Sequence, residues 1–200
     1  MNLQNPKKFK MLVDQAHEVA LHVLRPVSRK YDKAEHAYPK ELDMLASLVD
    51  GMNEGGEGMN AGAAGAGNRS ESDNEGNRNG TNMSTALSII EMCYGDTGLL
   101  LSMPRQGLGN SAIAAVANDE QLERFKGTWA AMAITESGCG SDSAAIRTTA
   151  IKDGDDYILN GEKIFVTSGE RADSVVVWAT LDKKLGRAAI KSFVVPKGTE

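Results

Sequence analysis

The spacing of apolar side chains changes near Gly127, and this change constrains the fold more than any other feature of the chain. Between residues 7 and 29 the apolar positions recur at i, i+3, i+4 and i+7, the spacing of one buried helix face. These positions are Phe9, Leu12, Val13, Ala16, Val19, Ala20, Val23, Leu24 and Val27. After Gly127, short alternating runs are separated by turn residues, which is typical of strands. We therefore predict an α+β fold, with a helical domain at 1–127 followed by an antiparallel β-sheet or barrel domain at 128–200.

Proline and capping residues set the expected ends of the helices. Pro26 should kink the first helix or end it early, because proline has no N–H to donate. A second helix should open at Tyr38-Pro39 and fade at Gly51. Asn118, with Gln121 three residues later, predicts a capped short helix through Phe125. Further helices are expected at 84–94, with Ser84 as the N-cap, and at 99–102.

Residues 51–82 differ in kind from both parts. They are rich in Gly, Asn, Ser and Glu and hold almost no large apolar side chain. Such a segment cannot bury enough surface to offset its chain entropy, so we predict a flexible loop. A glycine-rich phosphate cradle is the alternative. It is disfavoured, because no strand precedes the glycines and no GK[ST] sequence follows them.

Turn residues divide the second part into strands. Asp153-Gly154-Asp155 and Asn160-Gly161 are tight-turn signals, and Asn-Gly is the strongest short hairpin signal. The strands are expected at 130–135, 146–152, 157–160, 163–167, 174–181 and 190–195.

Composition excludes several classes of function. The 200 residues carry a net charge of -5 and no basic block interleaved with aromatics, so we expect no nucleic-acid partner. Cys93 and Cys139 lack metal-ligand spacing and are read as free thiols of a reducing compartment, and the three histidines form no ligand pair. No apolar run is long enough to span a bilayer, and residues 1–10 resemble no signal or transit peptide. A cytoplasmic protein without a metal site is expected.

Two stretches could carry chemistry. Residues 133–142 run from a strand into a loop with two glycines, hydroxyls and carboxylates, which would leave backbone N–H groups open to a flat or anionic ligand. On composition alone a polar turn is favoured. Residues 160–169 form an expected hairpin in which Phe165 and Thr167 share one strand face. Taken alone, that pattern is more typical of ordinary sheet packing than of a cofactor site.

Together, in this order and spacing, these stretches resemble the acyl-CoA dehydrogenase family. The family signature reads roughly T-E-P-G-x-G-S-D, then x-T-x-A, then N-G-x-K-x-[WF]-[IV]-T, and this chain matches it at 135–142, 147–150 and 160–167. Ser137 replaces the proline. Residues 24–32 and 38–42 are similar to the first two family helices, and 94–98 with 107–109 to its acyl-pocket helix. Residues 51–82 are longer and more polar than the usual connection, and 125–132 are shorter.

The resemblance implies FAD as cofactor, held against the β domain. The residues implied to face it are Met132, Ala133, Ile134, Thr135, Phe165, Val166 and Thr167. Thr135 should hydrogen-bond the pyrimidine end of the flavin, where donors stabilise the charge of the reduced ring. Phe165, in place of a frequent Trp, should pack along the ring, and Thr167 should place its hydroxyl near flavin N5.

The same resemblance implies substrate contacts. Ser141 should contact the CoA part of an acyl-CoA. The positions matching the acyl-pocket wall are Leu100, Leu101, Pro104 and Leu108. For each of these four, plain helix packing is an equal alternative.

The implied reaction is α,β-dehydrogenation of an acyl-CoA thioester, with an electron-transfer flavoprotein or a similar acceptor as partner. The family base lies in a carboxy-terminal helical bundle, so no catalytic residue is expected here, and Glu136 does not match that base. The β domain is expected to be incomplete, the isolated chain inactive and a poor FAD binder, and the full-length protein a homo-oligomer. An acyl-CoA oxidase, a flavin monooxygenase or a non-catalytic interaction module on the same scaffold are the alternatives.

Overall fold

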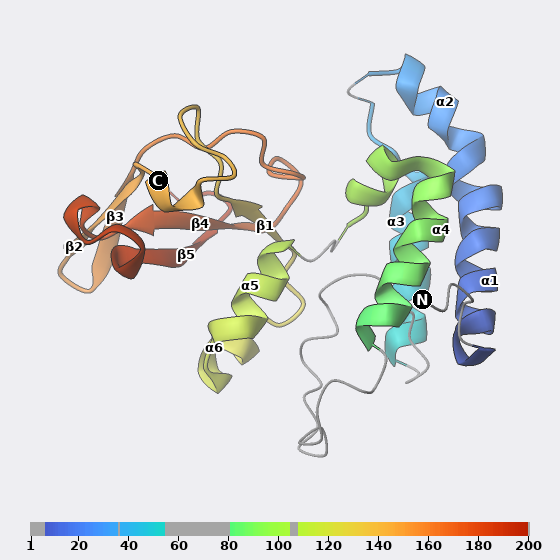
Figure 1. Cartoon of the computed structure of the whole chain (residues 1–200), viewed down its shortest axis with the longest axis horizontal. Coiled ribbons are helices and arrows are strands. Elements are labelled where there is room, and N and C mark those ends of the chain that lie inside the picture. The colour runs from blue at the N-terminus through green and yellow to red at the C-terminus, as the bar shows by residue number, and fades with distance from the viewer. Residues whose placement is uncertain (1–6, 36, 55–80, 105–107, 200) are drawn as a thin grey trace, which may run out of the picture. The chain divides into compact units, whose positions relative to one another are not determined.

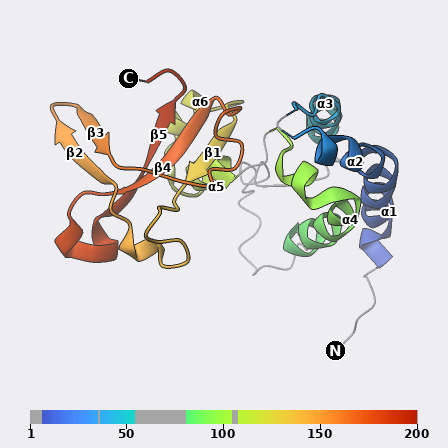
Figure 2. The ribbon, with the colours of Figure 1, turned by 90° about the horizontal axis from the view of Figure 1, so that it is seen from above.

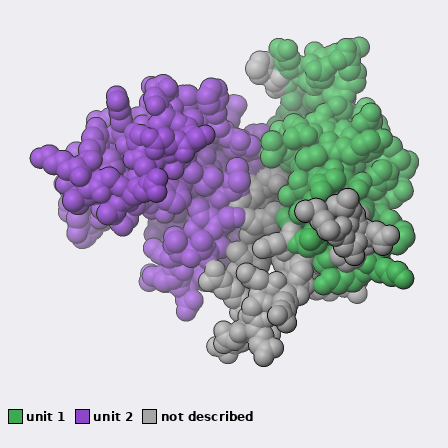
Figure 3. All heavy atoms as spheres, viewed as in Figure 1, with its two compact units in different colours: residues 1–106 green, residues 107–200 purple. Residues whose placement is uncertain are grey.

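A computed structural model describes residues 7–35, 37–54, 81–104 and 108–199. The chain forms two compact units, 1–106 and 107–200 (Figure 3). Helices α5 (Leu108–Val116) and α6 (Asp119–Arg124) therefore belong to the unit that holds the sheet. The sequence pattern had placed them with the helical domain, because their spacing is helical and gives no sign of which neighbour they pack against.

The first long helix of unit 1 continues through Pro26. It consists of a 3-10 turn η1 (Lys7–Phe9), α1 (Lys10–Val19), a π segment η2 (Ala20–Leu24) and α2 (Arg25–Lys33) (Figure 1). The expected early end at Pro26 is wrong. In the π segment the Arg25 N–H donates to the Ala20 carbonyl, five residues back. The wider turn lets the helix pass the residue that has no N–H of its own.

The expected second helix is present but longer than predicted. Helix α3 (Glu41–Glu54) begins just after Pro39, whose carbonyl accepts from the Leu42 N–H at 3.0 Å. It continues past Gly51, because one glycine weakens a helix by only about 1 kcal/mol and does not end it. The predicted loop at 51–82 is therefore helical at both ends, and its remainder, 55–80, lies outside the described residues.

Helix α4 (Thr81–Leu101) is broken at Asp96. Asp96 is extended (φ -171°, ψ 120°), and its Oδ1 accepts from the Leu99 N–H at 2.8 Å, so it acts as the N-cap of the second part. The predicted division of this region into two helices is confirmed. Ser84 is not the N-cap of the first part, because the helix already begins at Thr81.

The core of unit 1 is apolar and lies where these helices meet. Its buried members are Ala16, Leu24, Leu42, Leu45, Met92, Leu99, Leu100 and Met103. Gly95 allows α4 to approach η2 closely, since a methyl group there would lie 2.8 Å from the Ala20 carbonyl oxygen. Burial of these apolar side chains is the main favourable term in the packing of the helices.

Unit 2 is built on a five-stranded sheet whose hairpin of β2 and β3 is the orange pair in Figure 2. Its strands are β1 (Ala130–Ala133), β2 (Thr149–Asp153), β3 (Asp156–Asn160), β4 (Ser174–Thr180) and β5 (Ile190–Pro196). Short 3-10 segments η5 (Ser143–Ala145) and η6 (Lys183–Ala189) connect them. The hairpin predicted at Gly154 is present, with Asp153 paired to Asp156 and φ +61° at the glycine.

The sheet is mixed and not wholly antiparallel as predicted. Strand β4 pairs in parallel with β1, in the register Ala130 to Ser174, and antiparallel with β5. It also meets the start of β2 in parallel, at Thr149 and Thr180. Strands β1 and β4 are far apart in sequence, so their direction depends on the route of the intervening chain and not on a local pattern.

The strand predicted at 163–167 does not form. In the described segment 161–170 the backbone has no ladder pairing, and Phe165 (φ 57°) and Ser168 (φ 60°) are left-handed. A left-handed residue breaks the alternation on which a strand depends. The Asn160-Gly161 signal therefore marks the end of β3 and not a second hairpin.

Two negative findings apply to the described parts of the chain. No helix in them is long and apolar enough to cross a membrane. Nor do they gather three or more His, Cys, Asp or Glu side chains that could hold a metal ion. Cys93 and Cys139 are both free.

Helix α5 lies against β1 at Gly109, the second residue of the helix. A methyl group at Gly109 would lie 2.3 Å from the Ala131 carbonyl oxygen and 2.4 Å from that of Ala130, and neither backbone atom can yield cheaply. We expect Gly109→Ala to lower the free energy of unfolding by about 2 kcal/mol or more, because α5 must move off the sheet. Urea denaturation measures the change. Gly138→Ala is the control, since nothing lies within 4 Å of it, and equal stabilities of the two variants would contradict this packing.

Candidate functional site

The Glu136 carboxylate is the meeting point of the motifs in unit 2. The residue is 8% exposed, and its Oε1 accepts hydrogen bonds from the Thr148 N–H at 2.9 Å and the Thr148 hydroxyl at 2.6 Å. Oε1 also accepts from Lys163 Nζ at 2.8 Å, and Oε2 accepts from the Arg147 N–H at 2.7 Å. The three motifs that were recognised separately in the sequence thus converge on one side chain.

These donors set the charge state of Glu136. Burial by itself would raise the pKa of the carboxyl, since it removes water from the charged form. The hydrogen bonds from Lys163 and Thr148 outweigh burial and lower the pKa to about 2. The group is therefore a firmly ionised anchor and a poor proton acceptor near neutral pH, in agreement with the expectation that Glu136 is not the catalytic base.

Lys163 joins two predicted cofactor-facing segments. Its Nζ donates to the Ile134 carbonyl at 2.9 Å as well as to Glu136, and its side chain is 8% exposed. One residue later, the Ile164 N–H donates to the Thr135 carbonyl at 2.9 Å. The end of β1 and the segment before Phe165 therefore lie side by side.

Phe165 and Thr167 are both exposed, but not as neighbours on a strand face. Phe165 is 88% exposed and left-handed, and Thr167 opens a turn. The prediction that they share one strand face is wrong, because the strand itself is missing. Val166 packs instead on the buried cluster of Trp129, Ala131 and Ala172. The alternation thus leaves Val166 half-buried, with an exposed aromatic ring before it and an exposed hydroxyl after it.

The other predicted residues of unit 2 lie along the same stretch. Ala133 is buried in β1, while Met132, Ile134 and Thr135 are half-buried. Ser141 is exposed beyond the tight turn that Glu136 and Cys139 close with paired backbone hydrogen bonds. The structure therefore brings the predicted cofactor positions of β1 next to those of 165–167, with Ser141 on the loop that leaves them.

The predicted acyl-pocket residues have differing surroundings. Leu100 is buried in the core of unit 1, which is the packing role weighed as its alternative. Leu101 is half exposed and Pro104 is half-buried, both in unit 1. Leu108, also half exposed, opens α5 in unit 2. Their part in a substrate pocket stays a prediction.

Lys163 and Thr148 were not singled out by sequence reasoning, although both lie inside the quoted motifs. Lys163 is 27 residues from Glu136, and Thr148 is 12 residues from it. The available signal was that one motif of the signature carries an acidic residue, Glu136, and another carries a basic residue, Lys163. It did not reveal the pair, because nothing in a linear pattern states which distant carboxylate a lysine meets.

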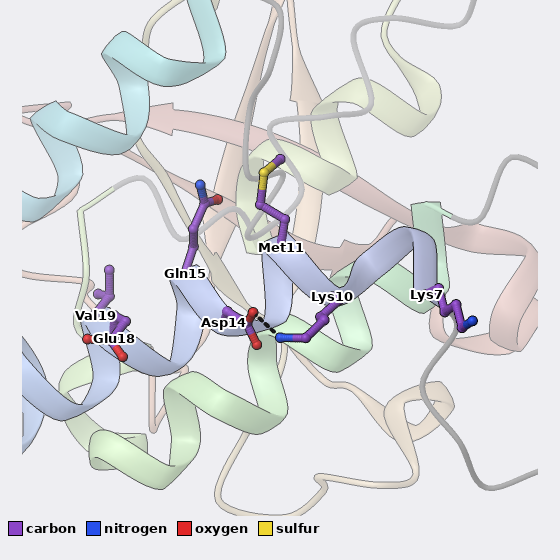
Figure 4. A pocket seen from close by; sticks show the side chains of 7 residues that line it. All are labelled: Lys7, Lys10, Met11, Asp14, Gln15, Glu18 and Val19. Atoms are coloured by element: carbon purple, nitrogen blue, oxygen red, sulfur yellow. Dashed lines mark hydrogen bonds and ion pairs between the residues drawn. The ribbon is translucent and has the colours of Figure 1, made fainter.

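The described parts of the chain contain two hollows, one in each unit. One, of about 720 Å³, runs along the outer face of α1 and is lined by residues of a single helical stretch, with the Lys10–Asp14 ion pair at its side (Figure 4). The other, of about 230 Å³, lies in unit 2 between residues 144–147 and η6. None of the residues predicted to face cofactor or substrate lines either hollow.

The low pKa of Glu136 predicts an acid-sensitive stability. The folded-state pKa of about 2 lies below the ordinary 4.5, so the stabilisation is present above about pH 4.5 and is lost as the pH falls toward 2. Between about pH 5 and pH 2.5 the wild type should lose about 2 kcal/mol more free energy of unfolding than Glu136→Gln. Urea denaturation at several pH values across this range measures the difference. Glu162→Gln is the control, because Glu162 is an exposed carboxylate next to Lys163 in the sequence. Parallel curves for wild type and Glu136→Gln would count against the network.

Comparison with known proteins identifies the scaffold. Residues 131–200 match the model of the acyl-CoA dehydrogenase middle domain. A cyclohex-1-ene-1-carbonyl-CoA dehydrogenase of Syntrophus aciditrophicus is 30% identical over 95% of this chain and 44% of its own length. A 3-(aryl)acrylate reductase of Clostridium sporogenes is 33% identical over 92% of this chain and 47% of its own.

A solved structure gives the same result. Butyryl-CoA dehydrogenase from Megasphaera elsdenii superposes with a TM-score of 0.76 and 25% identity, over 100% of this chain and 51% of that one. The chain thus spans about half the length of the relatives it matches. Residues 131–200 thus belong to the acyl-CoA dehydrogenase middle-domain family, and the chain is similar to acyl-CoA dehydrogenases along more than nine-tenths of its residues.

Proposed function

We propose that this chain supplies the flavin- and substrate-facing wall of an FAD-dependent enzyme that oxidises the α,β bond of an acyl-CoA thioester. The observation that carries the proposal is the 2.9 Å hydrogen bond from the Ile164 N–H to the Thr135 carbonyl. It sets the two stretches that match the family's flavin contacts beside each other. Membership of the family supports the same reading.

The exposed groups here suit a flat, partly polar ring. Phe165 offers an unburied aromatic face, and the hydroxyls of Thr135 and Thr167 can donate or accept hydrogen bonds. When bound, FAD supplies the acceptor for the hydride that leaves the substrate. In the proposal Met132 to Thr135 line the pyrimidine end, Phe165 stacks along the ring, Val166 supports it from the core, and Thr167 directs its hydroxyl to N5.

Substrate contacts are proposed for residues of both units. Ser141 would hold the CoA part from its exposed loop. The acyl-pocket wall would be Leu100, Leu101, Pro104 and Leu108. No residue of this chain is proposed as the base, and the carboxylate of Glu136 is occupied by hydrogen bonds from Arg147, Thr148 and Lys163 and held ionised.

Direction of reaction and electron partner follow from the same chemistry. One relative is named as a dehydrogenase and another as a reductase, and a flavin can take hydride from a saturated bond or return it to an unsaturated one. We propose the oxidative direction, with an electron-transfer flavoprotein as acceptor, in a homo-oligomeric cytoplasmic enzyme of fatty-acid or related acyl-CoA metabolism. Two free thiols agree with a reducing compartment.

Flavin binding tests the proposed cofactor wall. FAD titrated into the chain at high concentration should bind weakly and quench flavin fluorescence, and Phe165→Ala should weaken the affinity by about fivefold or more, because a stacked aromatic pair contributes about 1 kcal/mol or more. Since Phe165 is 88% exposed, its loss should leave the urea midpoint unchanged. Ile151→Ala is the control, because Ile151 is an exposed apolar residue (61%) of the same unit, outside the proposed wall. Equal FAD affinities of wild type and Phe165→Ala would exclude the stacking role.

Activity tests the proposed reaction. Acyl-CoA-dependent reduction of an electron-accepting dye, without oxygen consumption, is the result expected of the enzyme that contains this wall. Oxygen consumed in step with acyl-CoA would instead show an oxidase. The isolated chain should show little or no turnover, because it offers no base; robust turnover by it would contradict the assignment.

A further inference from the structure

We infer that Lys163, Glu136 and Thr148 form a buried positioning network that fixes the two backbone segments of the proposed flavin wall, with Lys163 as its central positioning residue. The inference rests on the proposed function for the identity of the ligand. The positioning itself is argued from contacts within unit 2.

Lys163 lies on the segment after β3 and donates two hydrogen bonds to the segment that follows β1. Its ammonium lies between the Ile134 carbonyl, at 2.9 Å, and Glu136 Oε1, at 2.8 Å. Through Glu136 it is linked to the backbone N–H groups of Arg147 and Thr148. One cation thereby ties the end of β1, the approach to β2 and its own segment into a single arrangement.

The segment after β3 needs such a link, because a sheet ladder does not hold it. Residues 161–170, all of them described, lie outside any strand, and the Ile164 N–H to Thr135 carbonyl bond is their backbone tie to the end of β1. Within the segment Phe165 and Ser168 are left-handed. A bulky residue keeps that conformation only where its surroundings impose it, and Lys163 is anchored two residues before Phe165.

Thr148 holds the start of the same segment, two residues before Lys163. A methyl group at Gly161 would lie 2.5 Å from the Thr148 hydroxyl oxygen and 2.7 Å from its Cα. The start of the segment therefore rests directly on Thr148, whose hydroxyl donates to Glu136. The contacts at Gly161 and Lys163 together fix the position of the backbone just before Phe165.

A buried ion pair adds little to the free energy of unfolding compared with apolar groups of the same size, but it favours one arrangement of the backbone segments that carry it. Replacing such a pair by apolar groups is often neutral for stability, because desolvation offsets much of the attraction. A charged hydrogen bond is instead strict in distance and direction. Removing Lys163 alone would leave the Glu136 carboxylate buried without its cation, so stability should fall as well, and the effect on ligand geometry has to be measured where the variant is still folded.

The test compares Lys163→Met with two controls. Lys152→Met removes an exposed lysine of β2, and Val176→Ala weakens the buried cluster on the α5 side without touching the network. At a temperature where every variant is folded, Lys163→Met should lower FAD affinity by about tenfold or more, since small misplacement of binding groups is costly. Both controls should stay within about twofold of wild type.

A second measurement needs no flavin. Hydrogen exchange of the Ile164 amide should accelerate by about tenfold in Lys163→Met, while amides of the β4–β5 pairing keep their wild-type rates. Thr148→Val should act in the same direction more weakly, and Thr149→Val, which removes the adjacent hydroxyl, should not.

The outcomes separate the inference from the proposed function. Wild-type FAD affinity together with wild-type Ile164 exchange in Lys163→Met would overturn the inference. So would a loss of affinity that Val176→Ala matches at equal stability, since that would reduce the effect to folding. If the wild-type chain binds no FAD, the proposed cofactor wall fails for this chain, and the exchange of Ile164 alone decides whether Lys163 positions its segment.

Discussion

A carboxylate inside a protein must find donors for both oxygens, because an uncompensated buried charge costs several kcal/mol. Glu136 meets this demand with donors from outside its own turn: the backbone of Arg147 and Thr148, the Thr148 hydroxyl and the Lys163 ammonium. The turn after β1, the approach to β2 and the segment after β3 must therefore meet at one point. The positions of Thr135 and of Phe165 follow from that meeting.

Each unit contains a stretch of irregular backbone, and different contacts stabilise it in each. In unit 1, α4 is broken at Asp96, and the backbone hydrogen bonds lost at the break are replaced by local contacts. Asp96 caps the following turn and accepts a hydrogen bond from Ser28 on α2. Just before it, Gly95 permits close helix contact, and Leu99 and Leu100 after the break enter the apolar core. Unit 2 uses a buried polar network instead. Its hydrogen bonds are stricter in distance and direction than apolar contacts, so they restrict the positions of the exposed groups nearby more closely.

Local signals predicted the features that depend on near neighbours. The capping box of Asn118 and Gln121 and the two-residue hairpin at Gly154 are present as expected, because their stabilising contacts join residues three apart. The segment 163–167 was predicted as a strand from its alternation. Val166 does pack, half-buried, against the cluster that contains Trp129, but the left-handed backbone at Phe165 removes the ladder. The passage of the first helix through Pro26 depends likewise on a π turn that no propensity scale states.

By itself the sequence determined the family, the order of helices before strands, and the stretches of chain that carry the proposed flavin wall. These follow from residue types at short, fixed spacings. Only the tertiary structure decided that Lys163 meets Glu136 from 27 residues away, that β1 runs parallel to β4, and that α5 and α6 belong to the same compact unit as the sheet. Such contacts depend on which distant groups can satisfy a buried charge or cover an apolar face, and that choice exists only once the whole chain has folded.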